Sequence, residues 1–155
     1  MASQIPLDTK YYPADFHVHT QNLGTLAGPN TLLYYFDRDV VIDSVTLTIP
    51  DNPTNANPGV NFKAIKMSTG AVPNYGTPVT GQTDVTTALN VLTGGTFPLR
   101  KTWADLTSTG FAATSSTDAR GNVVAAGSFL WICSDATVTG VTGPASITVR
   151  WRSQL

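Results

Sequence analysis

The clearest pattern in the chain lies between Asp39 and Asn52 (DVVIDSVTLTIPDN), where apolar and hydroxylated residues alternate. One set of alternate positions is apolar: Val41, Val45, Leu47 and Ile49. The other set carries hydroxyl groups: Ser44, Thr46 and Thr48. Successive side chains of a strand point to opposite faces, so the alternation predicts a strand with one buried and one exposed face. Ile42 and Asp43 interrupt it near its start, and Pro50, which cannot donate to a neighbouring strand, should end it.

Further segments have the length and composition of strands: residues 15–20, 31–36, 62–67, 84–92, 96–103, 128–134 and 146–152. Residues 31–36 and the Val41 strand are expected to form a hairpin through Asp37-Arg38-Asp39. The period of 62–67 fits a strand or a helical turn, and Ser68-Thr69-Gly70 favours the strand. A short helix after Asp84 is the alternative for 84–92. In the last strand the inward positions are expected to be Ile147, Val149 and Trp151, with Arg150 and Arg152 outward.

The composition favours the same architecture. All ten acidic residues are Asp, which prefers turns and caps, and the chain holds 13 Gly and 10 Pro. We therefore predict an all-β fold: a single, jelly-roll-like β-sandwich of about eight antiparallel strands over residues 14–155. Residues 104–122, rich in Ser, Thr, Ala and Gly, are expected to form a projecting loop.

Residues 1–13 precede the first expected strand and form a predicted N-terminal arm. A polar terminus is ordered only where it docks, and adjacent tyrosines favour docking, on the arm's own domain or on a neighbour. The interface candidates are the larger apolar residues of the arm: Ile5, Leu7, Tyr11, Tyr12 and Pro13.

One short segment contains the residue types of a metal site. Alternation in residues 15–20 predicts Phe16 and Val18 inward, which would place Asp15, His17 and His19 together on the outer face. Two imidazoles and one carboxylate are too few ligands for a closed site unless symmetry copies contribute. We interpret the three as the solvated face of an edge strand and predict no metal and no cofactor.

Charge and chemistry exclude several classes of function. The net charge is −1, which gives no broad positive field for nucleic acid, and no apolar run has the ~18 residues of a membrane span. Cys133, inside an apolar run, is expected to be buried. Asp37 and Asp39 flank Arg38, which favours a local ion pair over a calcium site. No hydrolase, metalloprotease or phosphate-loop motif occurs, so we predict neither an enzyme nor a small-molecule substrate.

Four short pieces within residues 32–152 occur in a distinctive order: Val41-Ile42-Asp43-Ser44-Val45, Lys63-Ala64-Ile65-Lys66 with Ser68-Thr69-Gly70, Val124-Ala125-Ala126-Gly127-Ser128 and Ile147-Thr148-Val149-Arg150. In these pieces and their order the chain resembles the small decoration, or cement, proteins of tailed bacteriophage and cyanophage capsids. The resemblance implies a jelly-roll domain that forms a homotrimer on the outer capsid surface and clamps neighbouring major capsid protein subunits. It implies no catalytic residues.

The expected function is therefore that of a structural virion protein, made in the host cytoplasm and bound to the outer shell. A surface with only 12% charged residues and many Thr residues suits close packing against neighbours. The alternative is a phage fibre, or a receptor-binding or carbohydrate-binding jelly-roll module, in which exposed rings stack on sugars. The candidate rings are Tyr11, Tyr12, Tyr75 and Trp103.

Overall fold

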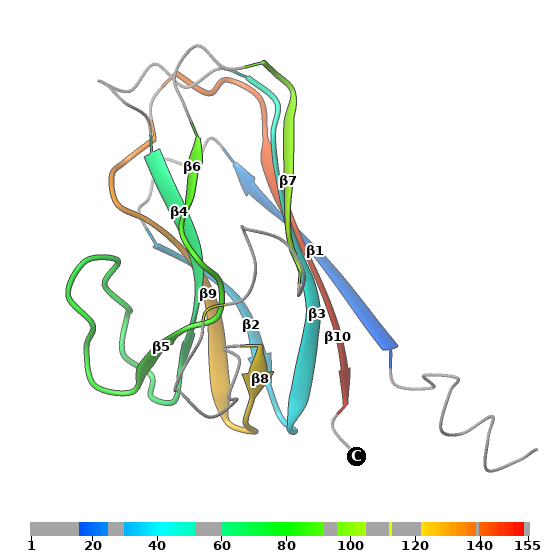
Figure 1. Cartoon of the computed structure of the whole chain (residues 1–155), viewed down its shortest axis with the longest axis vertical. Coiled ribbons are helices and arrows are strands. Elements are labelled where there is room, and N and C mark those ends of the chain that lie inside the picture. The colour runs from blue at the N-terminus through cyan, green and yellow to red at the C-terminus, as the bar shows by residue number, and fades with distance from the viewer. Residues whose placement is uncertain are drawn as a thin grey trace, which may run out of the picture.

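A computed structural model describes residues 16–24, 30–51, 60–91, 96–104, 112, 122–138 and 140–153. In these ranges the protein is all-β, without a helix, and consists of two antiparallel sheets packed face to face (Figure 1). The predicted β-sandwich is confirmed.

The first sheet, sheet A, has the order β1-β10-β3-β7, and β8 also pairs with β3. Its strands are β1 (Phe16–Gly24), β10 (Ala145–Ser153), β3 (Val40–Ile49), β7 (Leu99–Ala104) and β8 (Val123–Val124). The second sheet, sheet B, has the order β2-β9-β4-β5, and β6 also pairs with β4. Its strands are β2 (Asn30–Phe36), β9 (Ser128–Ser134), β4 (Val60–Met67), β5 (Gln82–Asp84) and β6 (Leu89–Val91).

This strand order is that of a jelly roll. The chain alternates between the sheets from β1 to β4, and the last two strands return between the first ones: β10 between β1 and β3, and β9 between β2 and β4. Such returns form the two Greek keys of the fold. The ten strands of the described residues correspond to the predicted eight because β5 and β6 occupy one edge of β4 in succession, and β8 is a two-residue addition to β3.

The core lies between the sheets and is built largely by the alternating strands that the sequence predicts. Ile147 and Val149 of β10 are fully buried, as are Val45 and Ile49 of β3. The expected alternation of inward and outward side chains does not hold at Val41, which was expected inward and is only partly buried. A bulge explains this difference: Ser44 lies opposite Arg150, but Ile42 lies opposite Trp151, so Asp43 is an extra residue. The extra residue reverses the phase and turns Val40 and Ile42 inward.

The hairpin predicted from residues 31–36 and 41–49 is wrong. β2 pairs with β9 and β3 pairs with β10, so the turn at Asp37-Arg38-Asp39 carries the chain from sheet B to sheet A. A hairpin and a crossover between sheets use the same turn residues, and only the distant partner strands distinguish them.

β4 is buried on both faces, which explains the ambiguous period of its sequence. Val60, Phe62 and Ala64 face the main core, whereas Ile65 and Met67 form a second cluster with Cys133 on the outer face of sheet B. Residues 68–81 pack over this cluster through Tyr75 and Val79, and the loop lies beside β4 and β5 in Figure 1. β5 pairs antiparallel with the end of β4, so the chain reverses its direction over residues 68–81.

The interruption between β5 and β6 is stabilised by one buried threonine. Thr86 is fully buried, and its Oγ1 accepts a hydrogen bond of 2.9 Å from the backbone N–H of Ala64. The carbonyl of Ala64 accepts the N–H groups of Val85 and Thr86 at 2.8 and 3.2 Å. The threonine side chain thus replaces one hydrogen bond between strands at the point where the edge strand is interrupted. The alternative prediction of a short helix after Asp84 is wrong.

We expect Thr86→Val to lower the free energy of unfolding by about 1–3 kcal/mol, because the nearly isosteric side chain leaves the buried Ala64 N–H without its acceptor. Thr86→Ser keeps the acceptor, loses one methyl group and should cost about 0.8 kcal/mol. Urea unfolding of the three proteins measures both effects. Equal stability of the Val variant and the parent would contradict this role of the hydroxyl.

Candidate functional site

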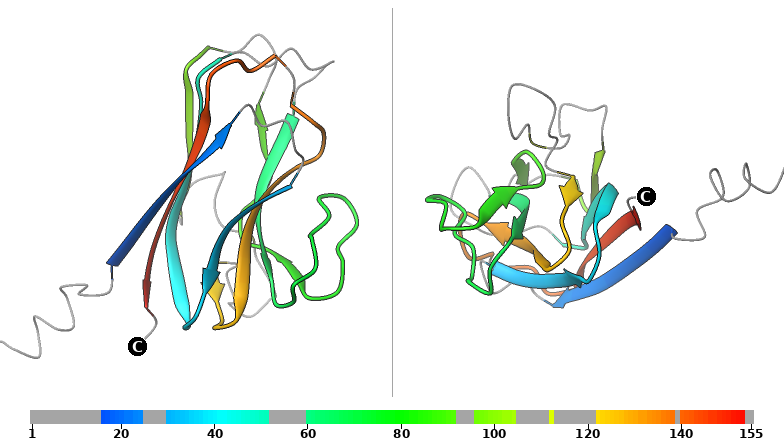
Figure 2. Two further views of the ribbon diagram at one scale, coloured as in Figure 1. Left: turned by 180° about the vertical axis from the view of Figure 1, so that it is seen from behind. Right: turned by 90° about the horizontal axis from the view of Figure 1, so that it is seen from below.

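One side of the sandwich exposes an edge of each sheet. In the part of the chain that the structure describes, β1 ends sheet A and β2 ends sheet B, and both lie on the side that faces the viewer in the left view of Figure 2. The two edges are joined by the amide of Gln21, whose Nε2 donates to the carbonyl of Leu32 at 3.1 Å. We call this side, made of β1 and β2, the β1–β2 flank.

A group of aromatic rings closes the core behind the flank. The ring of Tyr34 lies 4.6 Å from that of Trp151, 5.1 Å from Phe36 and 5.2 Å from His19. His17 stacks on Trp151 with a centroid distance of 5.5 Å and an angle of 18°. These rings from β1, β2 and β10 hold the two sheets together at their open edges.

A pocket of about 250 Å³ lies beside these rings. Its lining consists of His17, Tyr34, Tyr35, Phe36, Asp37, Arg38, Val40 and Trp151. At its rim Arg38 Nε donates to Asp37 Oδ1 at 3.0 Å, as the sequence predicts for a local ion pair. This hydrogen bond and the positive charge of Arg38 lower the pKa of Asp37. The pocket thus combines this charged pair with aromatic rings, of which Phe36 and Trp151 are almost fully buried.

The prediction that His17 and His19 face outward is wrong. The two residues lie opposite Trp151 and Val149, which point into the core, and both histidine rings contact core aromatics. Val18, predicted inward, is 52% exposed. Asp15 lies outside the described residues, and no group of three or more metal-ligating side chains occurs within them. The histidines act as aromatic packing groups, which hydropathy alone does not reveal.

Four buried polar atoms have no hydrogen-bond partner among the described residues. Nε2 of His19 and Oδ1 of Asn30 lie on the flank, Oγ of Ser153 lies on β10, and Nε1 of Trp131 lies on β9. Ser153 ends β10 and lies opposite Val40, a residue of the pocket wall. Buried polar atoms normally have partners, so a further group near these strands would stabilise the flank.

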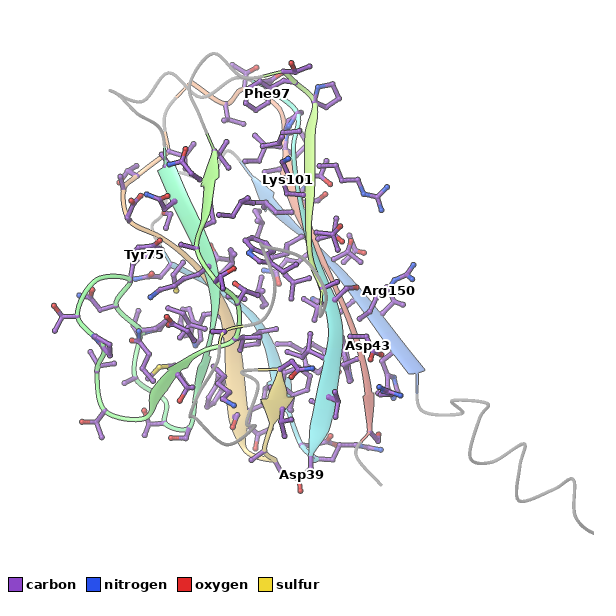
Figure 3. The ribbon with its side chains drawn as sticks, viewed as in Figure 1. Asp39, Asp43, Tyr75, Phe97, Lys101 and Arg150 are labelled. Atoms are coloured by element: carbon purple, nitrogen blue, oxygen red, sulfur yellow. The ribbon has the colours of Figure 1, made fainter. Side chains whose placement is uncertain are left out.

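The outer face of sheet A carries a row of four threonines, one on each main strand: Thr20, Thr148, Thr46 and Thr102. The hydroxyl groups of Thr20 and Thr148 lie 2.9 Å apart, and so do those of Thr46 and Thr102. The neighbouring row is also mainly polar and consists of Asn22, Ser146, Thr48 and Arg100. Figure 3 shows Arg150 on this side of the molecule and Tyr75 on the opposite side. We call this outer surface the threonine face.

The sequence does not predict that these threonines form one surface. It predicts outward threonines in the segments 41–49 and 146–152, but their alignment depends on the register between distant strands. Arg152 is held at one end of the face by Asp43, with a distance of 3.2 Å between Nε and Oδ1. The face thus combines many hydroxyl groups with three arginines, Arg100, Arg150 and Arg152, of which Arg152 is paired with Asp43.

The candidate sugar-stacking rings are not open platforms where the structure describes them. Trp103, predicted as an exposed candidate, is fully buried, and its Nε1 donates to the carbonyl of Thr87 at 2.9 Å. Tyr75 packs against the outer cluster of sheet B, and Nζ of Lys63 lies 4.6 Å from its ring centroid. Tyr11 and Tyr12 lie outside the described residues, as do the other interface candidates Ile5, Leu7 and Pro13 and nearly all of 104–122.

Three further reactive groups, Asp39, Lys66 and Cys133, are held in place by hydrogen bonds or by burial. Asp39 accepts a hydrogen bond of 2.8 Å from the N–H of Ala126, which fixes the turn before β9. Lys66 points between the sheets and donates to the carbonyl of Val123, and burial lowers its pKa. Cys133 is fully buried, as predicted, and burial raises the pKa of its thiol to about 12.

Comparison of the chain with protein-family models finds no match, and neither does comparison with curated proteins. In the described ranges no helix has the length and hydropathy needed to span a membrane.

We expect Cys133 to resist thiol reagents in the folded protein. With a pKa of about 12, on the order of one molecule in ten thousand carries a thiolate at about pH 8. Dithionitrobenzoate should label the thiol slowly in native buffer and rapidly in concentrated guanidinium. Equal rates in the two conditions would show that the site is accessible in the folded state.

Proposed function

We propose that this protein is a structural component of a phage virion: a decoration protein that binds the outer capsid surface and stabilises contacts between major capsid protein subunits. The observation that carries the proposal is the threonine face, a sheet surface with aligned hydroxyl groups on a jelly-roll domain. Thr20 and Thr102 are exposed on it, whereas Thr46 between their strands is buried. Hydroxyl groups on a sheet can exchange hydrogen bonds with water for hydrogen bonds with a docked surface at little cost.

The exposed edges of the β1–β2 flank support an assembly role. Strand edges carry unpaired backbone groups and are frequent sites of contact with other chains. Val18, Leu32 and Tyr35 are each more than 40% exposed on these edges and add apolar area for such contacts. A homotrimer would present three copies of the threonine face, so weak contacts at each site add up to stable decoration.

The described chemistry favours this function over the carbohydrate-binding alternative. Of the candidate stacking rings, Trp103 belongs to the core, and Tyr75 is partly buried against Lys63 and the outer cluster. Lys66 and Cys133, whose pKa values are shifted by burial, lie apart on opposite faces of sheet B. We therefore assign the protein no catalytic role.

Particles of the encoding phage that lack the protein should assemble with normal shape and rupture at a lower temperature than decorated particles. The bound protein adds contacts between shell subunits and changes none of the contacts that build the shell. Heating followed by a dye-accessibility assay for released DNA measures the difference. Identical rupture temperatures with and without the protein would contradict the proposal.

Thr102→Lys and Thr20→Lys should each weaken particle binding at least about tenfold, because docking would then bury an unpaired charge. Thr80→Lys is the matched control, an exposed position in the loop over sheet B. Sedimentation of particles with labelled protein measures binding, and urea unfolding verifies that the three variants are equally folded. Undiminished binding of both face variants would exclude the threonine face as the contact surface.

A further inference from the structure

A second pocket opens between the two sheets on the side away from the β1–β2 flank. In the described strand order β5 is the last strand of sheet B, and β8 pairs with β3 on the side away from β10. Figure 1 shows β5 and β8 near the same end of the sandwich. The pocket has a volume of about 300 Å³, and its lining includes Lys66 of β4, Thr83 of β5, Val123 of β8 and Ser128 of β9.

The strand register brings three polar side chains to this pocket. Thr83 lies directly opposite Lys66 in the β4–β5 pair, and Leu130 lies opposite Lys66 in the β4–β9 pair. Residues that lie opposite each other point to the same face of a sheet, and so does Ser128, two positions before Leu130. One ammonium group and two hydroxyl groups therefore share the inward face of sheet B at the end of the core.

Lys66 carries a half-buried positive charge without an opposite charge among the described residues. Its Nζ donates to the carbonyl of Val123, and none of the ion pairs within these ranges includes it. An ammonium group has three N–H donors, so the bond to Val123 leaves two of them for a ligand. The hydroxyl groups of Thr83 and Ser128 also have no hydrogen-bond partner in this part of the chain.

The other lysine of β4 has the partner that Lys66 lacks. Lys63 points to the outer face of sheet B, where Oδ2 of Asp84 lies 2.9 Å from its Nζ. Burial disfavours a charged group, and it lowers the pKa of Lys66, whereas a nearby opposite charge favours the charged form. A bound anion would supply that charge at Lys66, and the neighbouring hydroxyl groups would donate hydrogen bonds to it.

We propose that this pocket binds a small oxyanion, a phosphate or sulfate group, between Lys66, Thr83 and Ser128. The volume is at the lower end of the roughly 300–1,000 Å³ typical of small-molecule sites, so it suits the free ion or a small ester. The site lies away from the threonine face. Its failure would leave the capsid proposal unaffected, because that proposal is tested through Thr20 and Thr102.

A titration of the isotopically labelled full-length protein with inorganic phosphate, followed by nuclear magnetic resonance, tests the site. Sodium chloride holds the ionic strength constant. We expect saturable shifts of the amide signals of Thr83 and Ser128, and sulfate should shift the same signals. Glycerol phosphate distinguishes the two sources of the ligand: tighter binding than that of inorganic phosphate indicates a small ester, and weaker or equal binding indicates the free ion.

Two variants test the assigned groups. Lys66→Met should weaken phosphate binding at least about tenfold, because a charge-assisted hydrogen bond is lost. Thr83→Val keeps the charge, removes one donor and should weaken binding several-fold. Lys101→Met, which removes an exposed lysine of β7, is the matched control and should bind as the parent does. Urea unfolding verifies that the variants are folded.

The proposal is overturned if phosphate shifts the signals of Thr83 and Ser128 no more than chloride does at equal ionic strength. It is also overturned if Lys66→Met binds phosphate as tightly as the parent. If Lys66→Met did not fold, undiminished binding by Thr83→Val would be the contradicting result.

Discussion

The structure depends on the packing of the inward faces of β3 and β10 against sheet B. These two strands lie at the centre of sheet A, and their inward side chains between Val45 and Ile49 and between Ile147 and Trp151 are almost completely removed from water. Burial of apolar area is the main favourable contribution to folding, and here it fixes the register of both strands. The same register aligns the outward threonines, so the threonine face is a consequence of the core.

The central strands could be predicted from sequence because a single face of each is buried. Other elements could not be, for distinct physical reasons. The bulge at Asp43 reverses the phase of β3, β4 is buried on both faces, and the histidines of β1 pack as aromatic rings. Pairing between distant strands was not predictable, because strand order depends on contacts between residues far apart in the chain. For this reason the jelly roll was foreseen as a class, while the supposed hairpin after Phe36 was wrong.

The candidate site, too, could be predicted from the sequence only in part. Its residue types were visible: hydroxylated alternate positions in β3 and β10, and an aromatic segment in β2. The hydroxylated residues form a row, and the aromatic residues line a pocket, only in the folded sandwich. β9 and β10 return between the earlier strands, which brings β1 and β2 to one side of the molecule. The two faces of the sandwich differ as a result. The outer face of sheet B is partly covered by the chain's own loop of residues 68–81, whereas sheet A presents its hydroxyl groups outward.

The proposed decoration of a phage capsid depends on sheet A as the surface that meets the shell subunits. Electron cryo-microscopy of particles of the proposed source phage tests it most directly. The account predicts jelly-roll density on the outer shell with the threonine face toward the capsid subunits. Particles without this density, or density in which sheet A points to solvent and another surface contacts the shell, would contradict it.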